Sequence, residues 1–338
     1  MKLYVGIDLH SNNSYLVILD ENDKALYQKR LNNDLDYILN QLEPYQDSIE
    51  GIVVESTYNW YWLVDGLKAA GYRVHLANTT AIVQYSGLKY VDDKTDATWL
   101  ARLLRLGILA EGHIYPKEKR GVREMLRRRL ILVQQQTASL LGIQSIITRY
   151  EGIKISSDKI KRSEVEKLLS YLNDDDARFA AKCQLAILHS LMSQIENLEQ
   201  AILLKIKNDQ KFKLLKSVPG IGPILAMTIL LETGDINRFK QVSNYSSYCR
   251  CVDSKRLSNG KKKGENNRKN GNSYLSWAFV EAANYAIRYN DKIKNYYQKK
   301  TSKTKRIIAL KTISNKLSRA CYFMLRDGVE FDINKAFG

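Results

Sequence analysis

The chain has 338 residues and a formal net charge of +17, because 53 lysines and arginines outnumber 36 aspartates and glutamates. This length allows two or three domains, and the excess of basic side chains indicates an anionic partner, either nucleic acid or a membrane surface. The sequence begins directly with "KLYVGIDLH", contains no evident apolar stretch of the roughly 20 residues that span a membrane, and has four cysteines without a C-x-x-C pair. We therefore expect a cytoplasmic protein that has nucleic acid, and no membrane, as its partner.

Strand and helix patterns alternate over the first hundred residues. Three consecutive strands are predicted at residues 3–10, 14–20 and 24–31. They are followed by a helix at 34–45, an apolar strand at 50–57, a helix at 59–71 and a second apolar strand at 72–78. Antiparallel strands followed by alternating helix and strand predict a mixed sheet with helices on its faces. An α/β domain is therefore expected over residues 1–115.

Helix is predicted almost throughout the remainder. Residues 117–150 form one long helical pattern, and residues 174–207 form a second, whose apolar positions step by three and four. We expect the two to pair as an antiparallel coiled-coil stalk over 116–210, the alternative being an ordinary helix pair inside one domain. A mostly α-helical domain is expected over 211–338, with "VPGIG" (218–222) as a tight turn between helices, as in a helix-hairpin-helix.

Four carboxylates stand where a sheet and a helix can bring them together. Asp8 and Glu55 each close a predicted strand, and Asp93 and Asp96, in "VDDKTDATWL" (91–100), share one face of a helix start. Oxygen ligands of this kind hold Mg²⁺, and a pair of such ions promotes phosphodiester chemistry. The pattern predicts a site for Mg²⁺, with Mn²⁺ as a substitute. The alternative is that Asp8 ends a strand at a turn, Glu55 is a surface acid, and the aspartates cap a helix.

This order of strand–Asp, strand–Glu and Asp-x-x-Asp on a helix resembles the ribonuclease H-like (RuvC-like) fold of Holliday-junction resolvases. More closely, the chain resembles the DEDD transposases of insertion-sequence family one-hundred-and-ten. The resemblance covers nearly the whole chain, and it continues through "LRRRLILVQQQT" (126–137), "SVPGIGPILAMTILLETGDINRF" (217–239) and "SNGKKKGENNRKNGNSYLSWAFVEAA" (258–283).

The resemblance implies a serine nucleophile in the basic loop 250–274. In that family a Ser-Gly pair within a lysine- and glycine-rich loop bonds to DNA, and "LSNGKKKG" aligns Ser258 with this serine. An asparagine separates the serine from the glycine here, and "CRCVDS" replaces the family's Gly-Leu-x-Pro. Ser254 is the alternative nucleophile.

Several residues are expected to contact nucleic acid. Runs of lysines and arginines position phosphates or form solvated faces. Glycines in a tight turn let backbone N–H groups approach a phosphate, but a plain connection between two helices has the same sequence pattern. The candidates are Arg123, Arg127, Arg128, Arg129, Gly220, Gly222, Lys261, Lys262, Lys263, Arg268 and Lys269.

The function implied by the resemblance is transposition of an insertion sequence. The enzyme would cut and rejoin double-stranded DNA, at the element ends and at the target, through a phosphoserine intermediate. A non-coding bridge RNA would guide it, and a homo-oligomer, either a dimer or a tetramer, would be the working form. The alternatives are a Holliday-junction resolvase-like metal nuclease, a site-specific DNA invertase with the same active site, and a non-catalytic nucleic-acid-binding protein.

Overall fold

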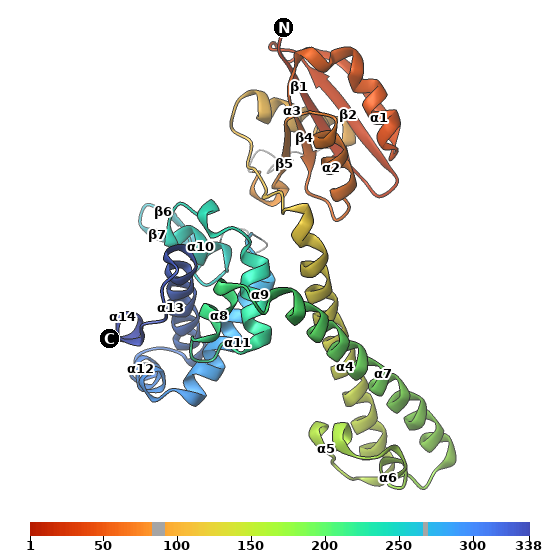
Figure 1. Ribbon diagram of the computed structural model, residues 1–338, viewed down its shortest axis with the longest axis vertical. Coiled ribbons are helices and arrows are strands. Elements are labelled where there is room, and N and C mark those ends of the chain that lie inside the picture. Colours follow the sequence, from red (N-terminus) through yellow and green to blue (C-terminus); the bar gives the residue numbers. More distant parts are fainter. Residues whose placement is uncertain (83–91, 266–269) are drawn as a thin grey trace. The chain divides into compact units, whose positions relative to one another are not determined.

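The computed structural model describes residues 1–82, 92–265 and 270–338, and these form two compact units (Figure 1). The first unit contains Met1–Lys117 and Ser254–Asn270, and the second contains Glu118–Asp253 and Gly271–Gly338. Two residues expected to contact nucleic acid, Arg268 and Lys269, lie outside the described part of the chain. The division into three domains at 115 and 210 stays a prediction.

The first unit is built on a mixed five-stranded sheet, as the sequence predicts. Its elements are β1 Leu3–Leu9, β2 Asn13–Leu19, β3 Ala25–Asn32, α1 Leu35–Leu42, β4 Ile49–Glu55, α2 Tyr61–Ala69, β5 Val74–Ala77 and α3 Asp93–Arg105. The strand order is β3-β2-β1-β4-β5, in which β1 pairs antiparallel with β2 and parallel with β4. This is the arrangement of a ribonuclease H-like DEDD fold.

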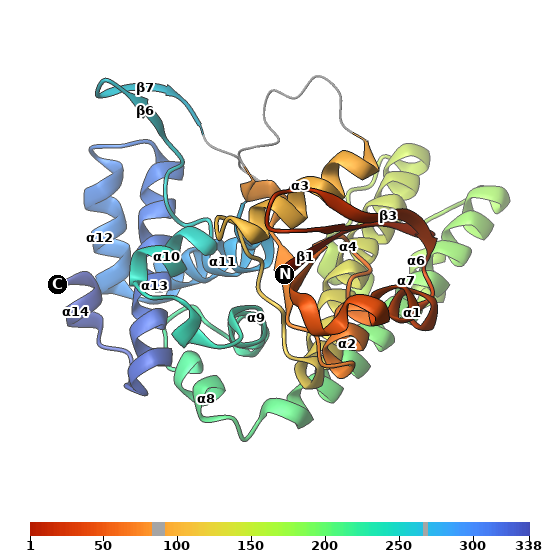
Figure 2. The same cartoon turned by 90° about the horizontal axis from the view of Figure 1, so that it is seen from above.

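Helices cover both faces of the sheet, with α1 and α2 on one side and α3 on the other (Figure 2). Alternate residues of β1, from Leu3 to Leu9, pack with α1 and α2. The residues between them, which include Gly6 and Asp8, therefore point toward α3, because side chains alternate across a strand. The sheet face that carries Asp8 is consequently the face that α3 covers.

The contact between α3 and β1 is close because Gly6 has no side chain. A Cβ atom added to Gly6 would lie 2.8 Å from the Ala101 backbone nitrogen and closer still to the Ala97 carbonyl oxygen. Ala97 and Ala101 are fully buried and are themselves small. Backbone therefore packs against backbone at this point, and the first turn of α3 is held beside the ends of the strands.

The second unit is helical. Its elements are α4 Lys117–Glu151, α5 Ser157–Arg162, α6 Val165–Leu169, α7 Asp175–Ile206, α8 Gln210–Lys216, α9 Pro223–Thr233, α10 Val242–Tyr248, α11 Ser273–Tyr289, α12 Asp291–Thr301, α13 Arg306–Asp327 and α14 Ile333–Phe337. The helices from α8 through α13 share one buried core. A separate core is formed by residues of α4, α5, α6 and α7.

The two long helices α4 and α7 pair antiparallel (Figure 1). Arg129 contacts Glu199, while ten residues further along α4 Ser139 accepts a hydrogen bond from Gln184, so the helices run in opposite directions. Contrary to the sequence expectation, α4 is long and apolar enough to cross a membrane by length and composition. Leu140, Ile143 and Ile147 of this helix pack into a core with α7, whereas Ile131 and Leu141 are exposed.

We predict that Gly6→Ala destabilises the protein by more than about 3 kcal/mol, because the added Cβ meets helix backbone that cannot move aside without separating α3 from the sheet. Gly51→Ala is the matched control, since Gly51 is a buried glycine of β4, and the three atoms nearest to its added Cβ would be side-chain atoms of His75 and Leu104, at 3.3–3.4 Å. The free energy of unfolding of both variants is measured in urea. Equal losses for the two variants would contradict the close approach at Gly6.

Candidate active site

The four acidic residues predicted to hold metal come from three elements that meet on the α3 side of the sheet. Asp8 lies next to the end of β1 and Glu55 ends β4. Because β1 and β4 are adjacent and parallel, with Ile7 opposite Val54, the two acids stand side by side at the carboxyl ends of the strands. Asp93 and Asp96 lie in the first turn of α3.

The third aspartate of this segment has a different role. The side chain of Asp92 accepts a hydrogen bond of 2.8 Å from the backbone N–H of Thr95 and so caps α3. The capping interpretation of "DDKTD" therefore holds for Asp92. Asp93 and Asp96, one and four residues later, are left for other interactions.

His10, which the sequence analysis did not single out, joins the acidic cluster. Its Nε2 lies 3.1 Å from Asp8 Oδ2 and 3.2 Å from Asp93 Oδ1. Asp93 also forms an ion pair with Arg30 of β3. Ligand atoms from Asp8, His10 and Asp93 all lie within 4.8 Å of one another, so one ion could contact all three residues.

The carboxylates repel one another strongly. Burial, a hydrogen bond with Asp8 and the charges of Asp8 and Asp96 raise the pKa of Glu55 to about 8. Burial and the neighbouring carboxylates, first among them Asp8, also raise the pKa of Asp96. Burial acts in the same direction on Asp93, but Arg30 and His10 outweigh it and lower the pKa of that carboxyl.

A divalent cation fits this arrangement. The side chain of Asp8 is almost fully buried, and its Oδ2 has no hydrogen-bond partner, because the contact with His10 is short but lacks hydrogen-bond geometry. A buried carboxylate oxygen without a partner is costly. Carboxylate oxygens are the ligands that Mg²⁺ and Mn²⁺ prefer, and imidazole is an accepted ligand of transition metals.

One signal in the sequence could have indicated His10. It follows Asp8 by two residues at the end of β1, and residues two apart in a strand lie on the same face. No comparable signal exists for Arg30, which reaches Asp93 only because β3 is the second strand from β1 in the sheet.

Ser258 lies in a short hairpin, where the sequence predicted a loop. It ends β6 (Arg256–Ser258) and pairs with Lys261, the first residue of β7 (Lys261–Gly264). Asn259 and Gly260 form the two-residue turn, and both have positive φ values, 50° and 70°. Asn-Gly is the preferred pair for such a turn. The asparagine that separates the serine from the glycine therefore has a local conformational reason, and Ser258 is exposed beside three exposed lysines.

Two transposase family models match the chain. Residues 5–151 match the model of the DEDD transposases of IS110, described as a transposase, and residues 212–298 match the model described as the transposase IS116/IS110/IS902 family. The chain belongs to the IS110 family of transposases. The first match contains the four acids and the second contains Ser258.

A relative in Pseudomonas aeruginosa supports the assignment. This protein, described as a probable family 20 transposase, is 23% identical to the chain over 235 residues, which are 68% of each protein. The family implies DNA as the substrate, and DEDD transposases typically use divalent metals. The acidic cluster of this transposase is consistent with such a metal, whose identity stays a prediction.

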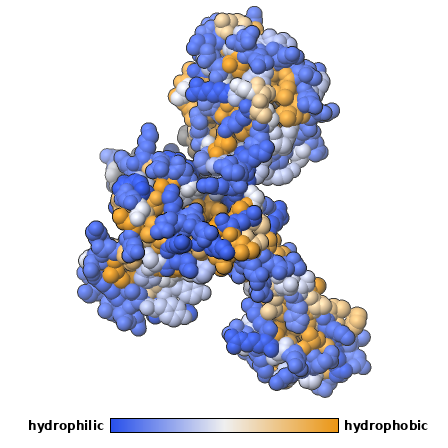
Figure 3. Space-filling view, viewed as in Figure 1, coloured by the Kyte–Doolittle hydropathy of each residue, from blue (hydrophilic) through white to orange (hydrophobic). Residues whose placement is uncertain are grey.

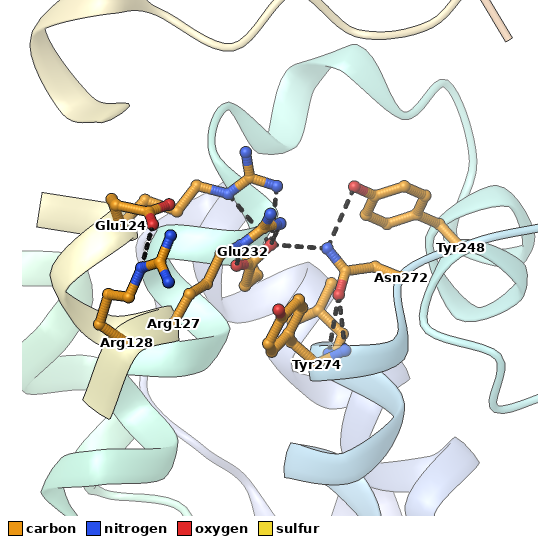
Figure 4. Close-up of polar contacts among 9 residues, drawn as sticks. Glu124, Arg127, Arg128, Glu232, Tyr248, Asn272 and Tyr274 are labelled. Atoms are coloured by element: carbon orange, nitrogen blue, oxygen red, sulfur yellow. Dashed lines mark hydrogen bonds and ion pairs between the residues drawn. The ribbon is translucent and has the colours of Figure 1, made fainter. Parts of the chain in front are cut away.

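The arginine-rich start of α4 faces a buried glutamate of the second unit (Figure 4). Glu232 of α9 is 1% exposed and accepts hydrogen bonds from Arg123 at 2.9 and 3.1 Å and from Arg127 at 2.7 and 3.0 Å. The side-chain amide of Asn272, at the start of α11, donates a further hydrogen bond of 2.7 Å. Burial opposes ionisation of Glu232, but Arg127 and Arg123 outweigh it and lower its pKa.

These contacts give Arg123 and Arg127 a structural role in joining α4, α9 and α11. Arg129 pairs with Glu199 of α7, and Arg128 pairs with Glu124 on the exposed face of α4. Binding of nucleic acid by the four arginines stays a prediction. Of the four, Arg128 is the most exposed and is the best placed for it.

We predict that the metal-free transposase loses stability as the pH rises from about 4.5 to about 8. In this window folded Glu55 keeps its proton whereas unfolded Glu55 has lost it, so the folded state binds more protons and rising pH favours unfolding. Glu55→Gln should flatten this part of the profile, because the amide cannot ionise. Urea unfolding in EDTA at several pH values measures it.

Glu118→Gln, at an exposed position of α4, is the control and should keep the wild-type slope. Mg²⁺ should stabilise the wild type most at the upper end of the range, because it binds the ionised carboxylates. A Glu55→Gln profile parallel to the wild type would contradict the raised pKa of Glu55.

We also predict that Glu232→Ala costs about 3–5 kcal/mol of stability, since it leaves two partly buried guanidinium groups without their partner. Glu124→Ala removes the exposed partner of Arg128 and should cost less than about 1 kcal/mol. Denaturant unfolding compares the two. Similar small losses would mean that the Glu232 network contributes little to the second unit.

Proposed function

We propose that this IS110 transposase cuts and rejoins double-stranded DNA at the ends of its element and at the target. Asp8, Glu55, Asp93 and Asp96 would hold Mg²⁺, with Mn²⁺ as a substitute. Ser258 would be the nucleophile, and Ser254 is the alternative. The observation that carries this proposal is that Asp8, His10 and Asp93 lie within reach of one ion, with Glu55 beside Asp8 and Asp96 in the same helix turn as Asp93, in a chain of the family.

The acidic cluster is suited to phosphodiester chemistry. A divalent ion, when bound, activates an attacking oxygen and stabilises a leaving oxygen. The buried Asp8 carboxylate fixes one side of the site, and Glu55, whose pKa is raised to about 8 without metal, would bind the ion in its ionised form. His10 and Arg30 orient Asp93 through their contacts with its two oxygens.

The proposed covalent step is an exchange of one ester bond for another. The Ser258 oxygen forms a bond to phosphorus while one P–O ester bond of the DNA strand breaks. The serine hydroxyl loses its proton to a base, and the departing strand end gains one as a free hydroxyl. Rejoining reverses the step with a hydroxyl of another strand end, so no external energy source is needed.

Cations around Ser258 support this role. Lys261, Lys262 and Lys263 are exposed on the same hairpin, and their charges attract phosphates and stabilise charge that develops on phosphorus-bound oxygens. The turn glycines Gly220 and Gly222 are proposed phosphate contacts of the second unit. Guidance by a non-coding RNA is part of the proposal because the resemblance to the family implies it, and the net charge of +17 suits more than one nucleic-acid partner.

Assembly of several copies is also proposed. The helix pair α4–α7 carries exposed apolar side chains, including Leu141, Phe179 and Ile187. Hydrophobic patches interrupt its hydrophilic surface on the face shown in Figure 3. Apolar surface on a long helix pair is typical of contacts between protomers, and it supports a dimer or a tetramer.

The test is a protein–DNA adduct. On a nicked suicide substrate that blocks rejoining, the wild type should accumulate a denaturation-resistant adduct in Mg²⁺, and it should map to the peptide containing "LSNGK". Ser258→Ala should form no adduct because it lacks the oxygen. Asp8→Asn should lose cleavage in Mg²⁺ while it keeps affinity for duplex DNA, since the amide weakens the metal site.

Ser243→Ala, at an exposed serine of α10, is the matched control and should react as the wild type does. Adduct lost in Ser254→Ala but kept in Ser258→Ala would move the nucleophile to Ser254. Cleavage without adduct in the wild type and in both variants would replace the proposal with a metal nuclease of the Holliday-junction resolvase kind.

A further inference from the structure

Two exposed tyrosines form a flat aromatic surface on α11. Tyr285 and Tyr289 are one helical turn apart, and their rings are almost parallel, with an interplanar angle of 9° and centroids 6.4 Å apart. The residues are 44% and 73% exposed. The opposite face of α11, from Leu275 to Ala286, is buried in the core of the second unit, so these rings are surplus to the packing of the helix.

The tyrosines border a groove. A depression of about 480 Å³ is lined by Tyr285, Tyr289, Lys216 and the turn from Val218 to Leu225. Its floor is apolar, with Val218, Ile221 and Pro223 among the lining side chains. It therefore offers aromatic and aliphatic surface next to backbone.

The turn is fixed against α11 by Gly220. This glycine has a φ of 85°, and a Cβ added to it would lie 2.6 Å from the Ala286 backbone nitrogen and closer still to the Ala282 carbonyl oxygen. Only glycine meets both requirements. The groove between the turn and the two tyrosines is consequently a rigid part of the unit.

The charge around the groove is positive. Lys216 is the one charged residue among the described residues that line it. The guanidinium carbon of Arg288 lies 6.0 Å from the centroid of the Tyr285 ring and 5.9 Å from that of the Tyr289 ring, and this side chain is exposed. An anionic partner is favoured over a cationic one.

We infer that this surface binds an unpaired DNA strand by stacking its bases on Tyr285 and Tyr289. Flat aromatic rings with adjacent cations bind single strands, because every base has an apolar face and every nucleotide has a phosphate. A duplex hides its base faces in its own stack, so it cannot use the rings in the same way. The inference rests on the proposed function, in which strand exchange separates the strands of the DNA.

The test compares three probes with the full chain. Fluorescence anisotropy measures the binding of labelled oligothymidylate of about 15 nucleotides, a matched DNA duplex and the corresponding oligouridylate. The measurement is made at elevated salt, which weakens contacts made by phosphate alone. The double variant Tyr285→Ala, Tyr289→Ala should bind the DNA strand at least about tenfold more weakly, since each stacked base contributes roughly 1–3 kcal/mol.

The double variant Tyr285→Phe, Tyr289→Phe should retain wild-type affinity, because it keeps both rings and loses only the hydroxyls. Tyr150→Ala, at an exposed tyrosine of α4, is the matched control and should bind as the wild type does. Duplex affinity should be the same in all variants, and their unfolding midpoints should match.

The inference would be overturned if the wild type and the alanine variant bound the DNA strand with equal affinity. It would also be overturned if the phenylalanine variant lost as much affinity as the alanine variant. A third contradicting result would be a loss of affinity in the alanine variant that is confined to oligouridylate or shared by the duplex. Adduct formation by Ser258 is measured separately, on a substrate that needs no unpaired strand in the groove. A negative result in one assay is therefore distinguishable from a negative result in the other.

Discussion

The close packing of α3 on β1 is the contact on which the candidate active site depends. Gly6 allows the backbone of α3 to approach the strand at Ala97 and Ala101, and the first turn of the helix, directly before Ala97, carries Asp93 and Asp96. Two residues after Gly6 the strand carries Asp8. A wider separation would leave Asp8 and Asp93 on two surfaces that could not contact the same ion.

This packing has an electrostatic cost. It gathers like charges beside a buried carboxylate, and as a consequence the pKa of Glu55 rises to about 8. Arg30 relieves the repulsion at Asp93, whereas His10 contacts both Asp8 and Asp93 and also acts on Asp96. The Oδ2 atom of Asp8 lacks a hydrogen-bond partner, and a divalent cation bound beside it would supply the remaining compensation. The metal-free site is thus a strained part of an otherwise well-packed unit.

The basic residues of the chain serve two different purposes. Arg123, Arg127 and Arg129 face carboxylates of the same unit and hold α4 against α9 and α7, whereas the three lysines of the β6–β7 hairpin are exposed. A count of charges treats both groups alike. The positive surface available to nucleic acid is therefore smaller than the composition suggests, and the exposed lysines of the hairpin are part of it.

The sequence by itself determined the mixed sheet, the long helices and the position of the acids at strand ends and a helix start. These features depend on local periodicity and on chain order, which are readable along the chain. It also contained enough family-specific order for the resemblance to IS110 transposases. Even the β6–β7 turn had a local signal, because Asn259-Gly260 is a hairpin pair.

Only the tertiary structure decided which side chains meet. His10 reaches Asp93, Arg30 reaches the same carboxylate across two strands, and Glu232 takes up two arginines that are more than a hundred residues away in the chain. The groove beside Tyr285 and Tyr289 likewise exists because Gly220 lets a distant turn touch α11. Pairings of this kind depend on distances between elements that are remote in sequence, and no local pattern carries that information.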